Sequence, residues 1–179
     1  MGLPSGPVAT VGRMASSAPV IRPATAADIP AIIAIREQVA GESRWIGREL
    51  PLPDDLADRL TLAIRDDSGV YFVADVDGLV VGDGGLHTPG TGHAELFMAI
   101  VDGQRGRGIG KQLLAASLDW ARGRPELHKV LLQVWPHNDR AIALYRHAGF
   151  IVEGYRHQHW RRADGDLWDV IEMGLVLDR

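Results

Sequence analysis

Three glycines at alternate positions mark the part of this chain best suited to bind an anion. Gly106, Gly108 and Gly110 follow an apolar segment that begins at Glu95 and precede an amphipathic one. Glycine tolerates positive φ angles and lets a ligand approach the backbone closely. The first N–H groups of a helix lack intrahelical partners and carry a partial positive charge. This segment therefore predicts a loop and a helix start that bind phosphate oxygens.

Two familiar nucleotide motifs do not fit these glycines. A dinucleotide fingerprint needs glycine at Lys111, and a Walker loop needs glycine at Arg105 and Ser or Thr at Gln112. The pattern Q/R-x-x-G-x-G/A does fit, with Arg105, Gly108 and Gly110. It resembles the pyrophosphate loop of the GNAT acetyltransferases, which bind acetyl-CoA. A glycine-rich turn with a purely structural role is the alternative.

A second segment, from Asn138 to Phe150, supports the same resemblance. It is similar to the GNAT pattern N-x-x-A-x-x-L-Y-x-x-x-G-F, with Tyr145 and Gly149 at the matching positions. The two motifs stand in the family's order, and the resemblance covers roughly residues 20–177. Ser43-Arg44, the Glu95 strand and a long terminal hairpin further resemble small bacterial amine, amino-acid or peptide N-acetyltransferases.

Composition limits the remaining functional classes. A chain of 179 residues with ordinary hydrophobic content suits one domain, and a net charge of −4 offers no basic face for nucleic acid. No apolar run approaches the ~18 residues that span a membrane, so we expect no membrane contact and a cytoplasmic protein. Since the chain has no cysteine, disulfides, thiolate metal sites and an acyl-cysteine intermediate are excluded.

Hydrophobic periodicity and turn residues predict the order βααβββαβαββ over residues 19–179. Residues 1–18 are expected to be a flexible leader, within which Met14 is a second candidate start. We expect one α/β domain with a central mixed, mostly antiparallel sheet flanked by helices, the GNAT fold. Predicted strands begin near residues 20, 70, 79, 95, 130, 151 and 167, and predicted helices near residues 29, 56, 109 and 138.

Some boundaries follow from particular residues. Thr25-Ala-Ala-Asp28 is typical of a capping box, and Asp77-Gly78 is typical of a tight hairpin between strands at 70–76 and 79–81. Residues 41–53 carry two prolines and no regular period, which predicts a long loop with either a binding or a purely connecting role.

Acetyl transfer to an amine needs a base and an acid. An alkylamine with a pKa of about 10.4 is neutral in only about one molecule in 2,500 at pH 7, so a proton acceptor matters. Glu95 is the candidate base, directly or through water, and apolar neighbours would raise its pKa. Tyr145 is the candidate acid, since the family places this tyrosine beside the sulfur of CoA. The alternatives are a solvated strand end for Glu95 and ordinary core packing for Tyr145.

The resemblance also implies the residues that hold acetyl-CoA. The pantetheine arm would lie against the backbone of Ile100 and Val101, where the Glu95 strand separates from the strand near Val130. An N–H near Ile100 could polarise the thioester carbonyl. Asn138 would contact the arm, cap its own helix, or do both. The phosphate-binding residues would be Arg105, Gly106, Arg107, Gly108, Ile109, Gly110 and Lys111.

The expected acceptor is a small-molecule or peptidyl primary amine that attacks acetyl-CoA directly in a ternary complex. A non-catalytic acyl-CoA sensor is the alternative. His157 and His159 alternate onto one face of a strand, but we predict no metal site. The resemblance implies that the terminal hairpin flanks the acceptor, which makes these histidines, Arg161 and Trp168 candidates for the substrate wall. Exposed strands near the terminal hairpin leave a homodimer open.

Overall fold

The computed structural model describes residues 17–66 and 68–177, and the predicted leader lies almost entirely outside them. The described strands form one seven-stranded sheet in the order β1-β2-β3-β4-β5-β7-β6. They are β1 (Val20–Pro23), β2 (Gly69–Val76), β3 (Leu79–His87), β4 (His93–Ile100), β5 (Lys129–Val134), β6 (Ile151–Arg161) and β7 (Leu167–Val176). The helices are η1 (Ala26–Asp28), α1 (Ile29–Gly41), α2 (Leu56–Arg65), α3 (Ile109–Arg122) and α4 (Asp139–His147). The predicted element order and mixed sheet are confirmed.

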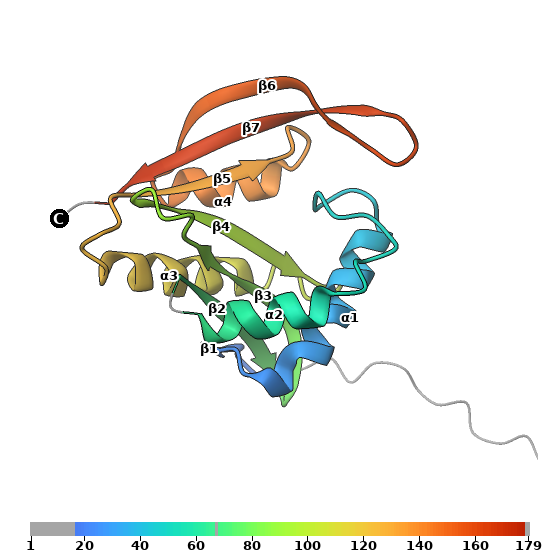
Figure 1. The fold of residues 1–179 in the computed structure, drawn as a ribbon, viewed down its shortest axis with the longest axis vertical. Coiled ribbons are helices and arrows are strands. Elements are labelled where there is room, and N and C mark those ends of the chain that lie inside the picture. Colours follow the sequence, from blue (N-terminus) through green and yellow to red (C-terminus); the bar gives the residue numbers. More distant parts are fainter. Residues whose placement is uncertain (1–16, 67, 178–179) are drawn as a thin grey trace, which may run out of the picture.

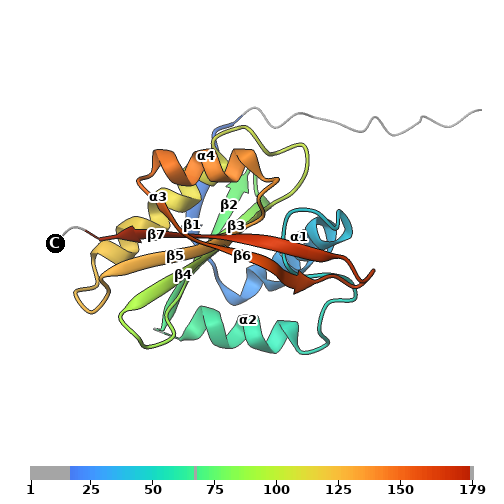
Figure 2. The same ribbon diagram turned by 90° about the horizontal axis from the view of Figure 1, so that it is seen from above.

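The helices form one layer on each face of the sheet. Figures 1 and 2 show α1 and α2 on one face and α3 and α4 on the other. Successive side chains of β4 pack against the two helical layers in alternation, because successive residues of a strand point to opposite faces. Ala99 packs against Ile35 and Val39 of α1, whereas Met98 packs with the cluster that includes Leu114 of α3. Among the described helices, none is long and apolar enough to cross a membrane.

The predicted capping box before α1 and the predicted hairpin turn between β2 and β3 are both confirmed. The Asp28 carboxylate accepts a hydrogen bond from the Thr25 backbone N–H at 2.8 Å, and α1 follows at once. Asp77 and Gly78 have φ angles of 54° and 81°, as a tight hairpin turn between β2 and β3 requires. Residues 42–55 connect α1 to α2 without a further helix or strand.

Strand β4 pairs on its two sides in different ways. It is antiparallel to β3 along most of its length, from Glu95 opposite His87 to Ile100 opposite Gly82. With β5 it is parallel, but the register contains only three positions and ends at Glu95 opposite Leu131. Beyond that position the two strands diverge, as Figure 1 shows. The expected separation of these strands is therefore present, and it begins at Glu95.

Strand β3 is longer than the sequence indicated. The prediction ended near Val81, but the strand runs to His87 through Gly82, Gly84 and Gly85. These glycines are weak strand formers, yet both neighbouring strands pair with them. A Cβ on Gly85 would collide with the carbonyl oxygen of Val70 on β2. The close fit between strands therefore requires glycine where local propensity argues against a strand.

The terminal hairpin forms as predicted, but its first strand is irregular. The register of β6 against β7 shifts between Arg156 and Trp160, and Gln158 has a φ of 50°. A shift of this kind is a β-bulge, which interrupts the alternation of side chains. The expectation that His157 and His159 alternate regularly onto one face is therefore wrong. His157 lies 3.0 Å from Asp169 and is largely exposed.

A buried ion pair joins α1 to β3. Asp83 is fully buried on the α1 face of the sheet, and the Arg36 guanidinium donates to both of its carboxylate oxygens. Arg36 also donates to the Tyr71 hydroxyl at 3.3 Å and lies over the Phe97 ring at 5.4 Å. Burial alone would lower the pKa of Arg36, but the Asp83 carboxylate raises it well above its ordinary value. Burial raises the pKa of Asp83, while the Arg36 guanidinium opposes that shift, and the hydrogen bonds between the two side chains tie helix to sheet.

Removing one partner of this pair should destabilise the fold strongly. In Asp83→Asn the buried guanidinium of Arg36 loses its counter-charge, and we expect a loss of about 3 kcal/mol in the free energy of unfolding. Urea unfolding at pH 7 measures the loss. Asp55→Asn is the matched control, because it breaks an exposed ion pair with Arg59 and should cost less than about 0.5 kcal/mol. Equal losses in the two variants would contradict the role of the buried pair.

Candidate functional site

The backbone of β4 faces the space where β4 and β5 diverge. The Val101 N–H donates to the Val81 carbonyl at 3.1 Å, toward β3. In an antiparallel ladder, successive residues direct their N–H and C=O groups to opposite sides. Ile100 therefore directs its N–H and C=O away from β3, toward the side of β5. Of the two residues predicted to contact the pantetheine arm, Ile100 has the orientation for it.

The glycine loop ends in a helix start without a side-chain cap. Gly106 and Gly108 both have a φ of 83°, which non-glycine residues rarely adopt. Gly108 is the N-cap of α3, and no side chain in the described part of the chain caps that end. The first N–H groups of α3, from Ile109 to Lys111, have no intrahelical acceptor. The Ile109 side chain is buried in the core, so this residue can offer a ligand only its backbone.

Gly110 has a different role from the other two glycines. A Cβ there would lie 3.3 Å from Leu144 of α4, 3.4 Å from the Met98 sulfur and 3.5 Å from Ile100. Its missing side chain lets the first turn of α3 pack closely on β4 and α4. The helix start, the open edge of β4 and α4 thereby meet at one point.

Arg140 is a site residue that the sequence analysis missed. It lies in the first turn of α4, and its guanidinium occupies the place where a Cβ of Gly106 would stand. The side chain is exposed, so a cation borders the glycine loop on its α4 side. The position falls inside the second motif, two residues after Asn138, but that pattern leaves it unspecified. Only the packing of α4 beside the glycine loop shows that Arg140 borders the site.

Arg105 is held by groups from two other segments. Its guanidinium donates to the Ile100 carbonyl at 2.8 Å and to both carboxylate oxygens of Glu42, at 2.7 and 2.5 Å. The Trp45 indole N–H donates to the same carboxylate at 2.6 Å. The hydrogen bonds from Arg105 hold the pKa of Glu42 below its usual range. The loop after α1 is thus fastened to the glycine loop, and nothing in the sequence pattern indicated Glu42.

The remaining cations of the loop lie at the surface. Arg107 donates to the Gln104 side chain at 2.6 Å, and Lys111 is exposed on the first turn of α3. With Arg140, they place positive charge around the uncapped helix start. This arrangement suits a ligand that carries several negative charges.

Helix α4 carries the other two predicted residues. The Asn138 side chain accepts a hydrogen bond from the Ala141 backbone N–H at 3.2 Å, so it caps its helix. Tyr145 packs on the main core cluster, with its ring 5.8 Å from that of Phe150. Burial raises the pKa of Tyr145 to about 12. Its hydroxyl therefore keeps its proton at neutral pH, as a proton donor must.

Glu95 is exposed, so apolar neighbours do not bury it and its side chain is solvated at this end of β4. Its side chain shares a face with Phe97 and Ala99, but α1 packs on Ala99, nearer the other end of β4. The residue that pairs with it on β3, His87, is exposed as well. Glu95 nevertheless occupies the last position at which β4 and β5 pair, at the apex of the divergence.

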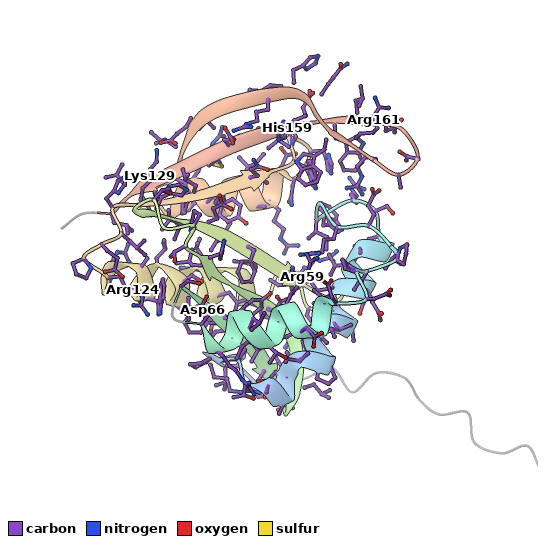
Figure 3. The ribbon with its side chains drawn as sticks, viewed as in Figure 1. Arg59, Asp66, Arg124, Lys129, His159 and Arg161 are labelled. Carbon is purple, nitrogen blue, oxygen red and sulfur yellow. The ribbon has the colours of Figure 1, made fainter. Side chains whose placement is uncertain are left out.

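Aromatic side chains of the terminal hairpin line the end of β5. The Trp168 ring packs edge-on against Trp135 and His137, at centroid distances of 5.2 and 5.0 Å. Arg162 fastens the hairpin to the loop after α1 through an ion pair with Glu49 at 3.1 Å. Figure 3 shows His159 and Arg161 on this hairpin, far from Arg124 and Lys129 at the other end of the sheet.

Comparisons with known proteins agree with this arrangement. A model described as the acetyltransferase (GNAT) family matches residues 35–150. An L-methionine sulfoximine/L-methionine sulfone acetyltransferase from Pseudomonas aeruginosa is 32% identical over 166 residues, covering 88% of this chain and 94% of the relative. An N-alpha-acetyltransferase from Mycobacterium tuberculosis is 35% identical over 102 residues, covering 55% of this chain and 62% of the relative.

Solved structures have the same fold. The ribosomal-protein-alanine N-acetyltransferase from Brucella melitensis superposes with a TM-score of 0.79 and 31% identity, over 88% of this chain and 99% of that one. An acetyltransferase from Salmonella typhimurium, solved with its cofactor acetyl-CoA, has a TM-score of 0.79 and 23% identity, over 91% of this chain and 96% of that one.

The contact between Glu42 and Arg105 predicts a pH-dependent contribution to stability. Because the folded-state pKa of Glu42 is lowered, the contact stabilises the fold above the unfolded glutamate pKa of about 4.3. That contribution is lost as the pH falls through the lowered pKa. At pH 7, Glu42→Gln should cost about 1 kcal/mol in unfolding free energy, and the difference from wild type should shrink toward zero in acid. Urea unfolding across the pH range measures it.

Glu37→Gln is the matched control for this variant. Glu37 is an exposed glutamate on the last turns of α1, and its replacement should leave the unfolding free energy within about 0.5 kcal/mol of wild type. A loss in Glu42→Gln that stays constant down to acid pH would contradict the ionic contact.

Proposed function

Because this chain belongs to the GNAT acetyltransferase family, we propose that it transfers the acetyl group of acetyl-CoA to a primary amine by direct attack in a ternary complex. The observation that carries the proposal is the meeting of three features at one place: the unpaired edge of β4, the uncapped start of α3 and the cations beside it. A phosphorylated ligand with an extended, amide-containing arm fits this combination. The amide groups would pair with β4, and the phosphates with the start of α3.

The proposed cofactor contacts follow the geometry of the loop. The N–H groups from Arg105 to Lys111 bind the pyrophosphate, and the side chains of Arg107, Lys111 and Arg140 add positive charge. The Ile100 N–H binds the arm or the thioester carbonyl, since it faces the divergence of β4 and β5. Arg105 acts through Glu42 and Ile100 to hold the loop in place. Asn138 keeps α4 beside this site through its cap.

In the proposed reaction, the neutral amine nitrogen attacks the thioester carbonyl carbon. A C–N bond forms, the C–S bond breaks, and the sulfur leaves as a thiolate. Tyr145 supplies the proton that the thiolate needs, since its hydroxyl is protonated at neutral pH. Glu95, directly or through water, accepts the proton that the amine loses. Its place where β4 and β5 separate supports this role, and its exposure gives it access to solvent.

We propose that the acceptor amine approaches from the face of the sheet opposite helices α3 and α4. The hairpin residues around Trp168 and the loop after α1 border this side. Relatives named for amino-acid and peptide acetylation support an amino acid, a small amine or a peptide N-terminus as the acceptor class. A cytoplasmic location and a homodimer stay predictions.

Release of CoA thiol from acetyl-CoA, followed with a thiol-reactive dye, tests the function. A panel of amino acids, polyamines and short peptides serves as acceptors, and the cysteine-free protein adds no background. Gly108→Asp should abolish turnover and weaken acetyl-CoA binding at least about a hundredfold, because a carboxylate then faces the phosphates. Gly103→Asp is the matched control, with a φ of 77° and open space around its Cβ.

Calorimetry of acetyl-CoA binding separates the outcomes. Normal binding by Gly108→Asp would show that the phosphates bind elsewhere. If wild type binds acetyl-CoA normally but turns over no amine, the result would contradict the transferase proposal and favour a non-catalytic acyl-CoA sensor.

Tyr145→Phe tests the proton donor. Turnover should fall at least about tenfold while the Kd for acetyl-CoA stays nearly unchanged, because only the transferred proton is lost. Since the pKa of Tyr145 is about 12, the wild-type rate should not decline from loss of this acid below about pH 11. Tyr155→Phe, on the exposed terminal hairpin, should retain wild-type turnover. Equal turnover in the two variants would remove Tyr145 from the mechanism.

A further inference from the structure

A cavity outside the cofactor region lies between α1, α2 and β2. Its volume is about 140 Å³, and three arginines line it: Arg36 from α1, Arg48 from the loop after α1 and Arg59 from α2. Tyr71 of β2 and apolar side chains of α2 complete the lining. Figure 3 labels Arg59 on α2, on the same side of the sheet as α1. No carboxylate belongs to the lining of this cavity.

The three arginines do not contribute equally to the charge of the cavity. The charge of Arg36 is offset by the buried Asp83, and that of Arg59 by Asp55 at 2.9 Å. Arg48 is exposed, and no ion pair engages it within residues 17–66 and 68–177. The cavity therefore has a net charge near +1, with further N–H donors from the two paired arginines. This charge matches one carboxylate better than a doubly charged phosphate.

The floor of the cavity reaches the strand that carries Glu95. The Tyr71 ring lies 4.6 Å from that of Phe97 on β4, and the two meet across β3 at Gly85. Because Gly85 has no side chain, the rings can touch over the intervening strand. Phe97 lies two residues after Glu95 on the same face of β4. The wall of the cavity is thus connected, through these two rings, to the strand that carries Glu95.

We propose that this arginine cavity binds a carboxylate of the acceptor, so that the acceptor is an amino acid with its reacting amine several bonds from that carboxylate. The proposal rests on the proposed function, because it assigns the acceptor class of the same site. Tyr71 aligns through Gly85 with Phe97, so the backbone of Glu95 lies about 10 Å across the sheet and a further two residues, about 7 Å, along β4. The amine of an α-amino acid is too close to its carboxylate to span that distance. An ω-amino acid, or a lysine-like side chain, spans most of it.

A series of amines with increasing spacing tests the proposal in the thiol-release assay. Glycine, γ-aminobutyrate and ε-aminocaproate are each compared with the amine that lacks the carboxylate, namely methylamine, propylamine and pentylamine. We expect kcat/KM for ε-aminocaproate to exceed that for pentylamine at least about tenfold, with a smaller ratio for glycine over methylamine. Ratios near one at every spacing would overturn the proposal.

Two variants of the same loop localise the effect. Arg48→Gln should lower kcat/KM for ε-aminocaproate at least about tenfold and bring its ratio to pentylamine near one. Arg44→Gln is the control, because Arg44 is an exposed arginine of that loop outside the cavity, placed over the Trp45 ring at 4.8 Å. Equal loss in both variants would indicate a general charge effect and would overturn the assignment to this cavity.

Binding without catalysis separates this proposal from the proposed function. Calorimetric titration of ε-aminocaproate into wild type saturated with CoA should show binding that Arg48→Gln weakens at least about tenfold and Arg44→Gln does not. If no amine is turned over but this binding is present, the cavity assignment stands and the transferase proposal fails. If turnover occurs but the carboxylate confers neither binding nor preference, the cavity assignment fails alone.

Discussion

The site depends on one constraint, the early end of the parallel pairing between β4 and β5. The two strands share three register positions and then separate, which leaves backbone groups of β4 without a neighbouring strand. Such groups are costly to bury without partners, so a ligand that supplies hydrogen bonds can take the place of the missing strand. Helix α3 begins close to the same opening, and its first N–H groups are free of side-chain caps. The proposed cofactor site thus combines the strand edge that this departure leaves open with an uncapped helix start beside it.

The opposite face of the sheet is organised by a buried charge. Asp83 would be strongly unfavourable in the core without Arg36, which comes from a different element and fixes α1 against β3. Gly85, two residues after Asp83 on β3, makes room for the rings of Tyr71 and Phe97 to meet. The same arrangement forms the floor of the arginine cavity. Strand β3 therefore carries both the buried ion pair with α1 and the ring contact beside the proposed carboxylate site.

The three glycines of the loop before α3 each have a different structural role. Gly108 supplies a left-handed backbone at the N-cap of α3, Gly106 leaves space for the Arg140 guanidinium, and Gly110 lets α3 pack on β4 and α4. A pattern of glycines in a sequence does not distinguish these reasons. Their common effect is to bring helix start, strand edge and α4 together, while Glu42 holds the loop through Arg105 from the far side.

The sequence by itself determined the order of elements, the hairpin at Asp77-Gly78, the glycine loop before α3 and the cap at Asn138, because these depend on local conformation and on residues near in the chain. It also indicated the family through two short motifs. Only the tertiary structure decided the length of β3, the exposure of Glu95, the bulge at Gln158 and the roles of Glu42 and Arg140. Each of these depends on contacts between segments distant in sequence, which neither periodicity nor propensity records. The arginine cavity is of the same kind, since its cations come from α1, α2 and the loop between them and meet only when the chain folds.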